Sequence, residues 1–203
     1  MKSMLKEAAI LFVITLISGC LLGLVYDVTK EPIAAAQAKA KEEACKEVFS
    51  DAADFTLRED ITSEAATKTV TDAGYLVTIN EVSEALDAKG MLLGYVITVT
   101  DHEGYGGDIQ FSIGIRNDGT VNGISFLSIS ETAGLGMKAD PVLKEQLVNK
   151  NAEQFSYTKT GANASDQIDA ISGATITTNA VVNGVNAGLE YFRTLQEGGS
   201  ANE

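Results

Sequence analysis

Small hydroxyl side chains crowd one short stretch near the C-terminus, D-A-I-S-G-A-T-I-T-T-N-A-V-V-N-G-V, which runs from Asp169 to Val185. A helix is predicted to begin within it, and a helix N-terminus offers unpaired N–H groups and the positive end of the helix dipole. Both features suit a bound phosphate. Thr177 or Thr178 is sufficient to cap the helix, so the hydroxyls of Ser172 and Thr175 are left without a structural explanation.

Two glycine-bearing stretches are candidate ligand loops. In the first, Gly173 and Ala174 would let a ligand approach the backbone closely. The second, Glu131-Thr132-Ala133-Gly134-Leu135-Gly136-Met137-Lys138, follows a predicted strand. Either its glycines only permit positive φ in a strand-to-helix connection, or its backbone lies against a flat or charged ligand. Neither stretch contains the Gly-Lys-Ser/Thr of a Walker loop or the G-x-G-x-x-G of a dinucleotide-binding fold, so these two motifs are excluded.

The elements that must position these loops are indicated by hydrophobic periodicity. Alternation of apolar and polar residues predicts four strands, at Tyr75–Val82, Leu93–Val99, Ile109–Ile115 and Val121–Ile129. Asn117-Asp118-Gly119 is a hairpin turn signal between the last two. Helices are predicted at Pro141–Asn149 and Thr178–Gln196. Strands with helices set apart from them predict an α+β fold, an antiparallel sheet with flanking helices, and not a parallel βαβ fold.

Composition excludes several classes of function. The 203 residues carry a net charge of −13, which argues against nucleic acid as a partner, because phosphates need a basic face. The single histidine, His102, is predicted to be a surface residue, and it leaves little material for a histidine metal site or a Ser-His-Asp triad. Cys20 and Cys45 form no C-x-x-C pair, so neither zinc, an iron–sulfur cluster nor a disulfide is expected.

The N-terminus contains a predicted transmembrane helix. Nineteen residues without a charge, Ala8–Tyr26, span about 28 Å as a helix, close to the thickness of a bilayer core. Lys2 and Lys6 precede this run, so the positive-inside rule places residues 1–26 as a cytoplasmic N-terminus and span, with the rest of the chain on the extracytoplasmic side of the cell membrane.

One alternative for the anchor is lipidation. Ile17-Ser18-Gly19-Cys20 matches a lipoprotein cleavage site, and cleavage there would leave a lipidated Cys20 and an anchored protein that does not span the membrane. The apolar run continues beyond Cys20, which favours the uncleaved span.

A stalk, one domain and a tail are predicted to follow. Residues 27–54 are predicted to form a juxtamembrane stalk helix, because Asp27–Phe49 is rich in alanine, lysine and glutamate. Thr29 is expected to cap this helix and Pro32 to lie in its first turn. Residues 55–196 are predicted to form the extracytoplasmic domain, and residues 197–203 a disordered tail.

Three segments resemble the FMN-binding domains of membrane redox pumps. Asp169-Ala170-Ile171-Ser172-Gly173-Ala174-Thr175 resembles the family's flavinylation motif. Glu131–Gly136 resembles its E-T-P-G-L-G loop, with Ala133 where proline is usual, and Gly104–Gly107 also resembles the family. The similarity covers roughly residues 90–195. With one span, a stalk and one outer domain, the chain is similar to the G subunit of Rnf electron transport complexes, which are ion-translocating ferredoxin:NAD+ oxidoreductases. The alternative is the FMN-carrying C subunit of the sodium-translocating NADH:quinone reductase.

The resemblance implies an electron carrier with covalent FMN. It implies that a flavin transferase joins the phosphate of FMN to Thr175 as a phosphoester, and that the flavin ring lies against the Glu131–Lys138 loop with Tyr105 stacking on it or covering it. The implied cofactor-binding residues are Asp169, Ser172, Gly173, Ala174, Thr178, Glu131, Thr132, Leu135, Gly136, Lys138 and Tyr105. The implied partners are the other membrane subunits of the complex, with lipid around residues 8–26.

Two other classes of function compete with this one. A non-redox binding or sensory module outside the membrane would need no chemistry at Thr175, and its purified protein would be colourless. A self-sufficient flavin reductase would need a nicotinamide site or a catalytic acid or base, and the sequence presents no convergent candidates for either. The chain is therefore expected to carry electrons within a complex and not to catalyse a reaction alone.

Overall fold

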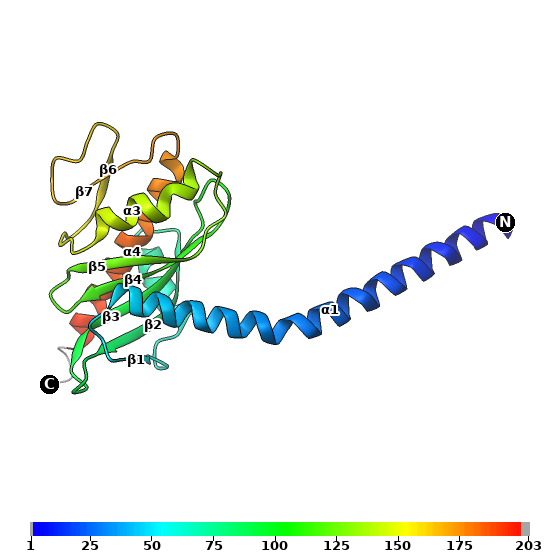
Figure 1. Ribbon diagram of the computed structural model, residues 1–203, viewed down its shortest axis with the longest axis horizontal. Helices are drawn as coiled ribbons and strands as arrows, with labels where there is room; N and C mark the ends of the chain where they lie inside the picture. The colour runs from blue at the N-terminus through cyan, green and yellow to red at the C-terminus, as the bar shows by residue number, and fades with distance from the viewer. Residues whose placement is uncertain (1, 200–203) are drawn as a thin grey trace. The chain divides into compact units, whose positions relative to one another are not determined.

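The computed structural model describes residues 2–199, and the chain divides between Ala40 and Lys41 into two compact units. Helix α1, Lys2–Val48, contains the whole described part of the first unit and continues into the second (Figure 1). By length and composition, α1 can cross a membrane.

The predicted break between the span and the stalk is absent from α1. The Thr29 hydroxyl does not cap a helix; it donates to the carbonyl oxygen of Val25 at 2.8 Å and lies 3.3 Å from that of Tyr26. Pro32 lies inside the helix and not in a first turn. Its ring nitrogen has no N–H, so the carbonyl of Val28 loses its usual donor. The predicted cap and start are thus wrong, because the apolar and alanine-rich sequences on either side both propagate helix.

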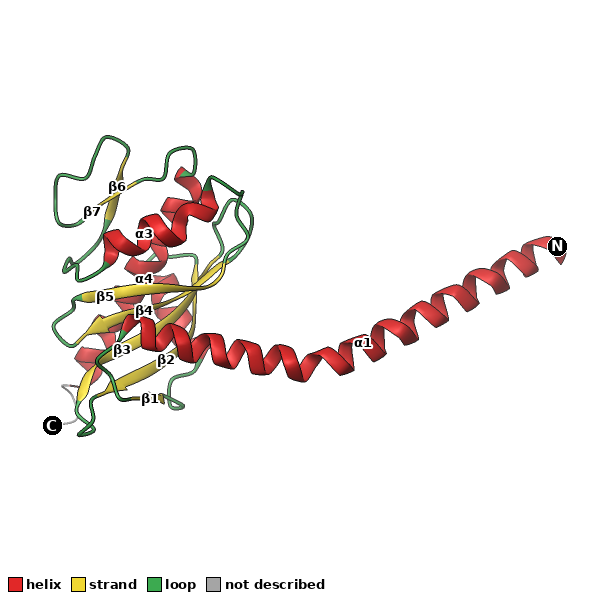
Figure 2. Cartoon of the chain, in the orientation of Figure 1, coloured by secondary structure: helices red, strands yellow, loops and turns green. Residues whose placement is uncertain are grey.

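The second unit is built on a five-stranded antiparallel sheet in the order β1-β2-β3-β4-β5 (Figure 2). Its strands are β1 Asp54–Leu57, β2 Val77–Leu86, β3 Leu92–Asp101, β4 Ile109–Arg116 and β5 Val121–Ser128. The other elements are α2 Ser63–Asp72, the 3₁₀ helix η1 Gly136–Lys138, α3 Ala139–Leu147, α4 Thr175–Gly199, and the parallel pair β6 Ser156–Thr158 and β7 Gln167–Asp169. The predicted α+β class with an antiparallel sheet is confirmed.

Several element boundaries differ from the prediction. β1, α2, β6 and β7 lie outside the predicted elements: the three strands are only three or four residues long, too short for a clear alternation, and α2 has only two buried apolar residues, Ala66 and Val70. α3 begins two residues before the predicted Pro141. α4 begins at Thr175 instead of Thr178 and includes the first three residues of the predicted tail; residues 200–203 lie outside the described residues.

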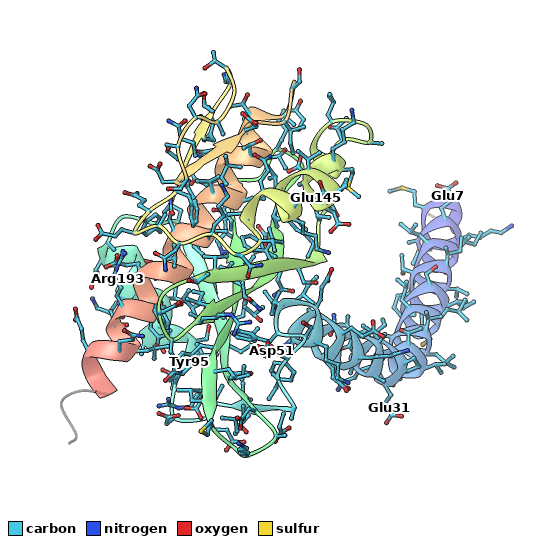
Figure 3. All side chains as sticks on the ribbon, turned by 60° about the vertical axis from the view of Figure 1, so that its left-hand side comes forward. Glu7, Glu31, Asp51, Tyr95, Glu145 and Arg193 are labelled. Carbon is cyan, nitrogen blue, oxygen red and sulfur yellow. The ribbon has the colours of Figure 1, made fainter. Side chains whose placement is uncertain are left out.

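The two faces of the sheet are covered by different helices. Successive strand residues point to opposite faces, and one face of β3 and β4 packs against α4, with Val99 and Phe111 close to Gly184. The Tyr95 ring of β3, labelled in Figure 3, lies edge-on to the ring of Phe192 in α4. The ring centroids are 6.1 Å apart. On the other face, the fully buried Phe49, just after the end of α1, packs against the backbone of β3 and β4.

Close packing of α4 on the sheet depends on two of its glycines. A Cβ atom at Gly184 would lie 2.6 Å from Cζ of the buried Phe111 ring, and one at Gly188 would lie 2.6 Å from Cδ1 of Ile113. Since the first turn of α4 lines the candidate site, these contacts also fix the position of that turn.

We expect Gly184→Ala to destabilise the domain and Gly188→Ala to do so less. Each change gains about 1 kcal/mol of helix propensity, but overpacking a rigid ring costs about 1–3 kcal/mol. The Ile113 methyl is the flexible end of its side chain and has more freedom to move than the ring. Urea unfolding of the full chain in detergent, followed by circular dichroism, compares the two variants. Equal stabilisation by both would show that α4 packs loosely on the sheet.

Candidate functional site

A cavity of about 450 Å³ lies where three loops of the second unit meet. The loops are Gly104–Gly107 between β3 and β4, Glu131–Leu135 leading from β5 to η1, and Ile171–Ala174 before α4. The cavity is lined by Tyr105, Glu131, Thr132, Leu135, Gly136, Gly173, Ala174, Thr175, Ile176 and Thr177. The two glycine-bearing stretches singled out from the sequence thus face the same space.

The start of α4 is set by a tight turn. The Ala174 N–H donates to the Ile171 carbonyl at 2.9 Å, and Gly173 has φ +77°, a left-handed conformation that favours glycine. α4 begins at Thr175, so the N–H groups of its first turn have no intrahelical acceptor and are available to a ligand.

The Thr178 hydroxyl holds this turn and does not line the cavity. Its oxygen accepts the Ile171 N–H at 3.1 Å and its proton is donated to the Ala174 carbonyl at 3.0 Å. The side chain is fully buried. The prediction that Thr177 or Thr178 caps the helix is therefore wrong, because α4 begins at Thr175 and both residues lie inside it. Thr178 instead holds the preceding turn in place from within the helix.

Exposure separates the two threonines that line the cavity. Thr177 is 1% exposed, whereas Thr175 is partly exposed. Within residues 2–199, the Thr175 hydroxyl makes no hydrogen bond to another protein atom. Thr175 therefore offers a hydroxyl at the cavity wall that solvent and a second molecule can both reach.

The Glu131 loop approaches α4 at backbone distance. The Thr132 carbonyl accepts the N–H groups of Leu135 at 3.1 Å and Met137 at 3.2 Å, which folds the loop back on itself. A Cβ atom at Gly136 would lie 2.7 Å from both Oε2 of Glu131 and Oγ1 of Thr177. No side chain fits there, so glycine at 136 is what allows this loop to meet the first turn of α4.

The Gly104–Gly107 loop forms the third wall. The Gly106 N–H donates to Oε1 of Glu131 at 3.2 Å, which ties this loop to the preceding one. Tyr105 is 71% exposed at the rim. Together with the exposed Leu135 and Ile176, it contributes an apolar part of the cavity lining, whereas Glu131 and the lining threonines contribute the polar part.

Four residues predicted for the site lie outside the lining. Asp169 accepts the Ala162 N–H at 2.6 Å and shapes a neighbouring loop. Ser172 is exposed beside the turn, and Lys138 is exposed in η1 with its N–H donated to the Leu135 carbonyl. Thr178 is the fourth. Ile176 and Thr177 line the cavity without having been predicted as ligands, because the helix was expected to begin after them.

Asp101 lies at the base of the Gly104–Gly107 loop, at the end of β3. It is fully buried; Oδ1 accepts the Glu103 N–H at 2.7 Å, and Oδ2 has no partner among the described residues. Burial is the main cause that raises the pKa of this carboxyl to about 6; the hydrogen bond from the Glu103 N–H acts against this rise, and the charges of Glu103 and Asp108 act with it. His102, next to it, is exposed as predicted, between Thr78 and Asp108 at 2.9 Å from each.

Comparison with known proteins places these features in a family context. The FMN-binding domain family matches residues 104–190, which contain all three loops, and the RnfG N-terminal region matches residues 1–48. The G subunit of the Na+-translocating ferredoxin:NAD+ oxidoreductase complex of Acetobacterium woodii is 32% identical over 200 residues, covering 97% of this chain and 95% of that protein. The G subunit of the ion-translocating oxidoreductase complex of Methanosarcina acetivorans is 34% identical over 199 residues, covering 97% and 98%. The crystal structure of Shewanella oneidensis NqrC aligns with a TM-score of 0.48 and 22% identity, over 59% of this chain and 62% of that one.

We expect Asp101→Asn to remove a pH-dependent loss of stability. The folded-state pKa of Asp101 lies above the unfolded value of about 4. Its favourable contribution to the free energy of unfolding is therefore complete below pH 4 and is lost as the pH rises through about 6. The asparagine retains an oxygen for the Glu103 N–H. Urea unfolding between pH 4 and 7.5 should show the variant gaining stability over the parent as the pH rises. The exposed Asp54→Asn is the control, and parallel pH curves for parent and Asp101→Asn would contradict the expectation.

Proposed function

The chain belongs to the G-subunit family of ion-translocating oxidoreductase complexes, a family of single-pass membrane proteins with an FMN-binding domain, and we propose that it is an electron-carrying component of a ferredoxin:NAD+ oxidoreductase complex of this kind. The observation that carries the proposal is the convergence of three loops and the Thr175 hydroxyl on one cavity at the start of α4. Its partners would be the other membrane subunits of the complex.

The residues of the cavity fit a flavin mononucleotide. Its volume lies in the range of small-molecule sites, and the apolar side chains of Tyr105, Leu135 and Ile176 suit a flat aromatic ring. The first-turn N–H groups of α4 and the helix dipole suit a phosphate. Bound FMN would supply the electron-transfer chemistry, and the chain would supply position, shielding and electrostatic environment.

The FMN is proposed to be covalently attached to Thr175. A flavin transferase would use FAD: a bond forms between Oγ1 of Thr175 and the phosphorus of FMN, the pyrophosphate bond of FAD breaks, AMP leaves, and the hydroxyl proton is released. Thr175 is favoured because its hydroxyl is accessible and unbonded among the described residues, whereas Thr177 is buried and Thr178 is engaged. The phosphodiester retains a negative charge, which the N-terminus of α4 stabilises.

The domain is proposed to lie on the extracytoplasmic side of the membrane. Lys2 and Lys6 precede the apolar run, and residues 8–26, in contact with lipid, carry no charge. A covalent link gives the carrier an advantage there, because a dissociated flavin would be lost from the cell.

We expect Thr175→Ala to abolish covalent flavin. After co-expression with a flavin transferase, the parent should fluoresce on a denaturing gel under ultraviolet light, and its Ser172–Thr178 peptide should gain the mass of FMN less water. The alanine variant should show neither signal, with stability changed by only about 0.5 kcal/mol, as for a surface substitution. Ser172→Ala and Thr177→Ala are matched controls that should keep the modification. Flavin retained in Thr175→Ala, or mapped to Thr177 or Thr178, would refute the assignment.

To test the proposed topology, we expect a thiol engineered into the domain to react with a reagent added outside the cell. In a background without Cys20 and Cys45, Ala88→Cys places a thiol in the exposed β2–β3 turn, and Ser3→Cys places one before the apolar run. A membrane-impermeant maleimide should label the first in intact cells and the second only after lysis. The reverse pattern would place the domain in the cytoplasm.

A further inference from the structure

Glu131 is a buried carboxylate with one oxygen left without a partner. The residue is 9% exposed in the cavity wall. Its Oε1 accepts the Gly106 N–H at 3.2 Å, but Oε2 is shielded from solvent and has no hydrogen-bond donor among residues 2–199. A buried acceptor without a donor lowers the stability of the fold, so the fold alone does not account for a carboxylate at this position.

The neighbours of Oε2 place the charge next to the cavity. The position that a Cβ atom of Gly136 would take lies 2.7 Å from Oε2 and equally far from Oγ1 of Thr177, and both residues line the cavity. Glu131 itself also lines the cavity, so its side chain forms part of the cavity wall. Because water does not reach Oε2, its charge is weakly screened and acts strongly on whatever the cavity holds.

We propose that Glu131 lowers the reduction potential of the flavin bound in this cavity, an inference that rests on the proposed function above. When an external reductant gives oxidised FMN two electrons and the solvent gives it one proton, the reduced flavin carries one more negative charge than the oxidised form. A fixed carboxylate in the wall of the cavity would oppose that added charge by like-charge repulsion. The unpartnered oxygen leaves this charge uncompensated by the protein, so Glu131 favours a flavin that readily passes its electrons onward.

A glutamine variant distinguishes an electrostatic role of Glu131 from a purely structural one. A residue that only holds the Gly104–Gly107 loop acts through the bond to the Gly106 N–H, and glutamine can accept that bond equally well with its amide oxygen. A tuning residue acts through its charge, which glutamine lacks. Glu131→Gln therefore removes the charge while keeping the volume and the acceptor.

The test is a spectroelectrochemical titration of the full-length, flavinylated protein in detergent. The potential of Glu131→Gln should shift upward relative to the parent, while the control Glu59→Gln, which removes an exposed charge between β1 and α2, should leave it unchanged. Glu131→Met is the second variant. It has similar volume and no charge, and it also removes the acceptor of the Gly106 N–H. It should load flavin and shift the potential in the same direction, because both variants lack the charge.

The outcomes separate failure of this inference from failure of the proposed function. A parent without covalent flavin would refute the proposed function before any potential is measured. Flavinylated parent, Glu131→Gln and Glu131→Met proteins with the same potential would refute the role of Glu131 alone. If neither variant folds while Glu59→Gln does, Glu131 is a structural residue and the inference is equally overturned.

Discussion

No side chain fits at Gly136, because a Cβ atom there would lie 2.7 Å from both the Glu131 carboxylate and the Thr177 hydroxyl. This contact brings the loop after β5 against the first turn of α4 with only backbone between them. Glu131 then reaches across to the Gly106 N–H, which fixes the third loop. Three loops that are far apart in the sequence thus come together at the cavity, and the absence of a side chain at Gly136 lets one of them approach α4 closely.

The hydroxyls at the start of α4 are alike in sequence but differ in environment. Each residue of a helix is rotated by about 100° from the one before it, so neighbouring threonines face different surroundings. Thr178 points inward and braces the Ile171–Ala174 turn, and Thr177 is buried beside Glu131. Thr175 faces the cavity with its hydroxyl accessible, and Ser172 is exposed outside it. Burial of Thr177 and Thr178 thus leaves Thr175 as the threonine of this segment that is accessible at the cavity.

Two buried carboxylates flank the Gly104–Gly107 loop, Asp101 before it and Glu131 beneath it. Each has one oxygen without a partner, and they are the two such side chains in the described part of the chain. Unpartnered buried acceptors reduce stability, and natural proteins keep few of them. Both carboxylates lie around the Gly104–Gly107 loop. They reduce the stability of this region, but they create an electrostatic environment that apolar side chains at the same two positions would not provide.

The sequence by itself determined the elements that local pattern can encode. The sequence alone reveals the uncharged run Ala8–Tyr26, four of the five strands of the sheet and the three segments that resemble an FMN-binding domain. The short elements β1, α2, β6 and β7 were missed, because the three strands are only three or four residues long and α2 has only two buried apolar residues, Ala66 and Val70. β1 gains its order by pairing with β2, and β6 by pairing with β7, and neither pairing has a local signature. Tertiary structure decided which of the predicted site residues share a space. Asp169 and Lys138 were predicted for the site but do not line the cavity, and Asp169 instead accepts the Ala162 N–H. The start of α4 at Thr175 depends on the positive φ of Gly173, and a sequence offers several equally good caps in this stretch. The close approach at Gly136 and the unpartnered oxygen of Glu131 have no local signature at all, because both arise from backbone segments that only the folded chain brings together.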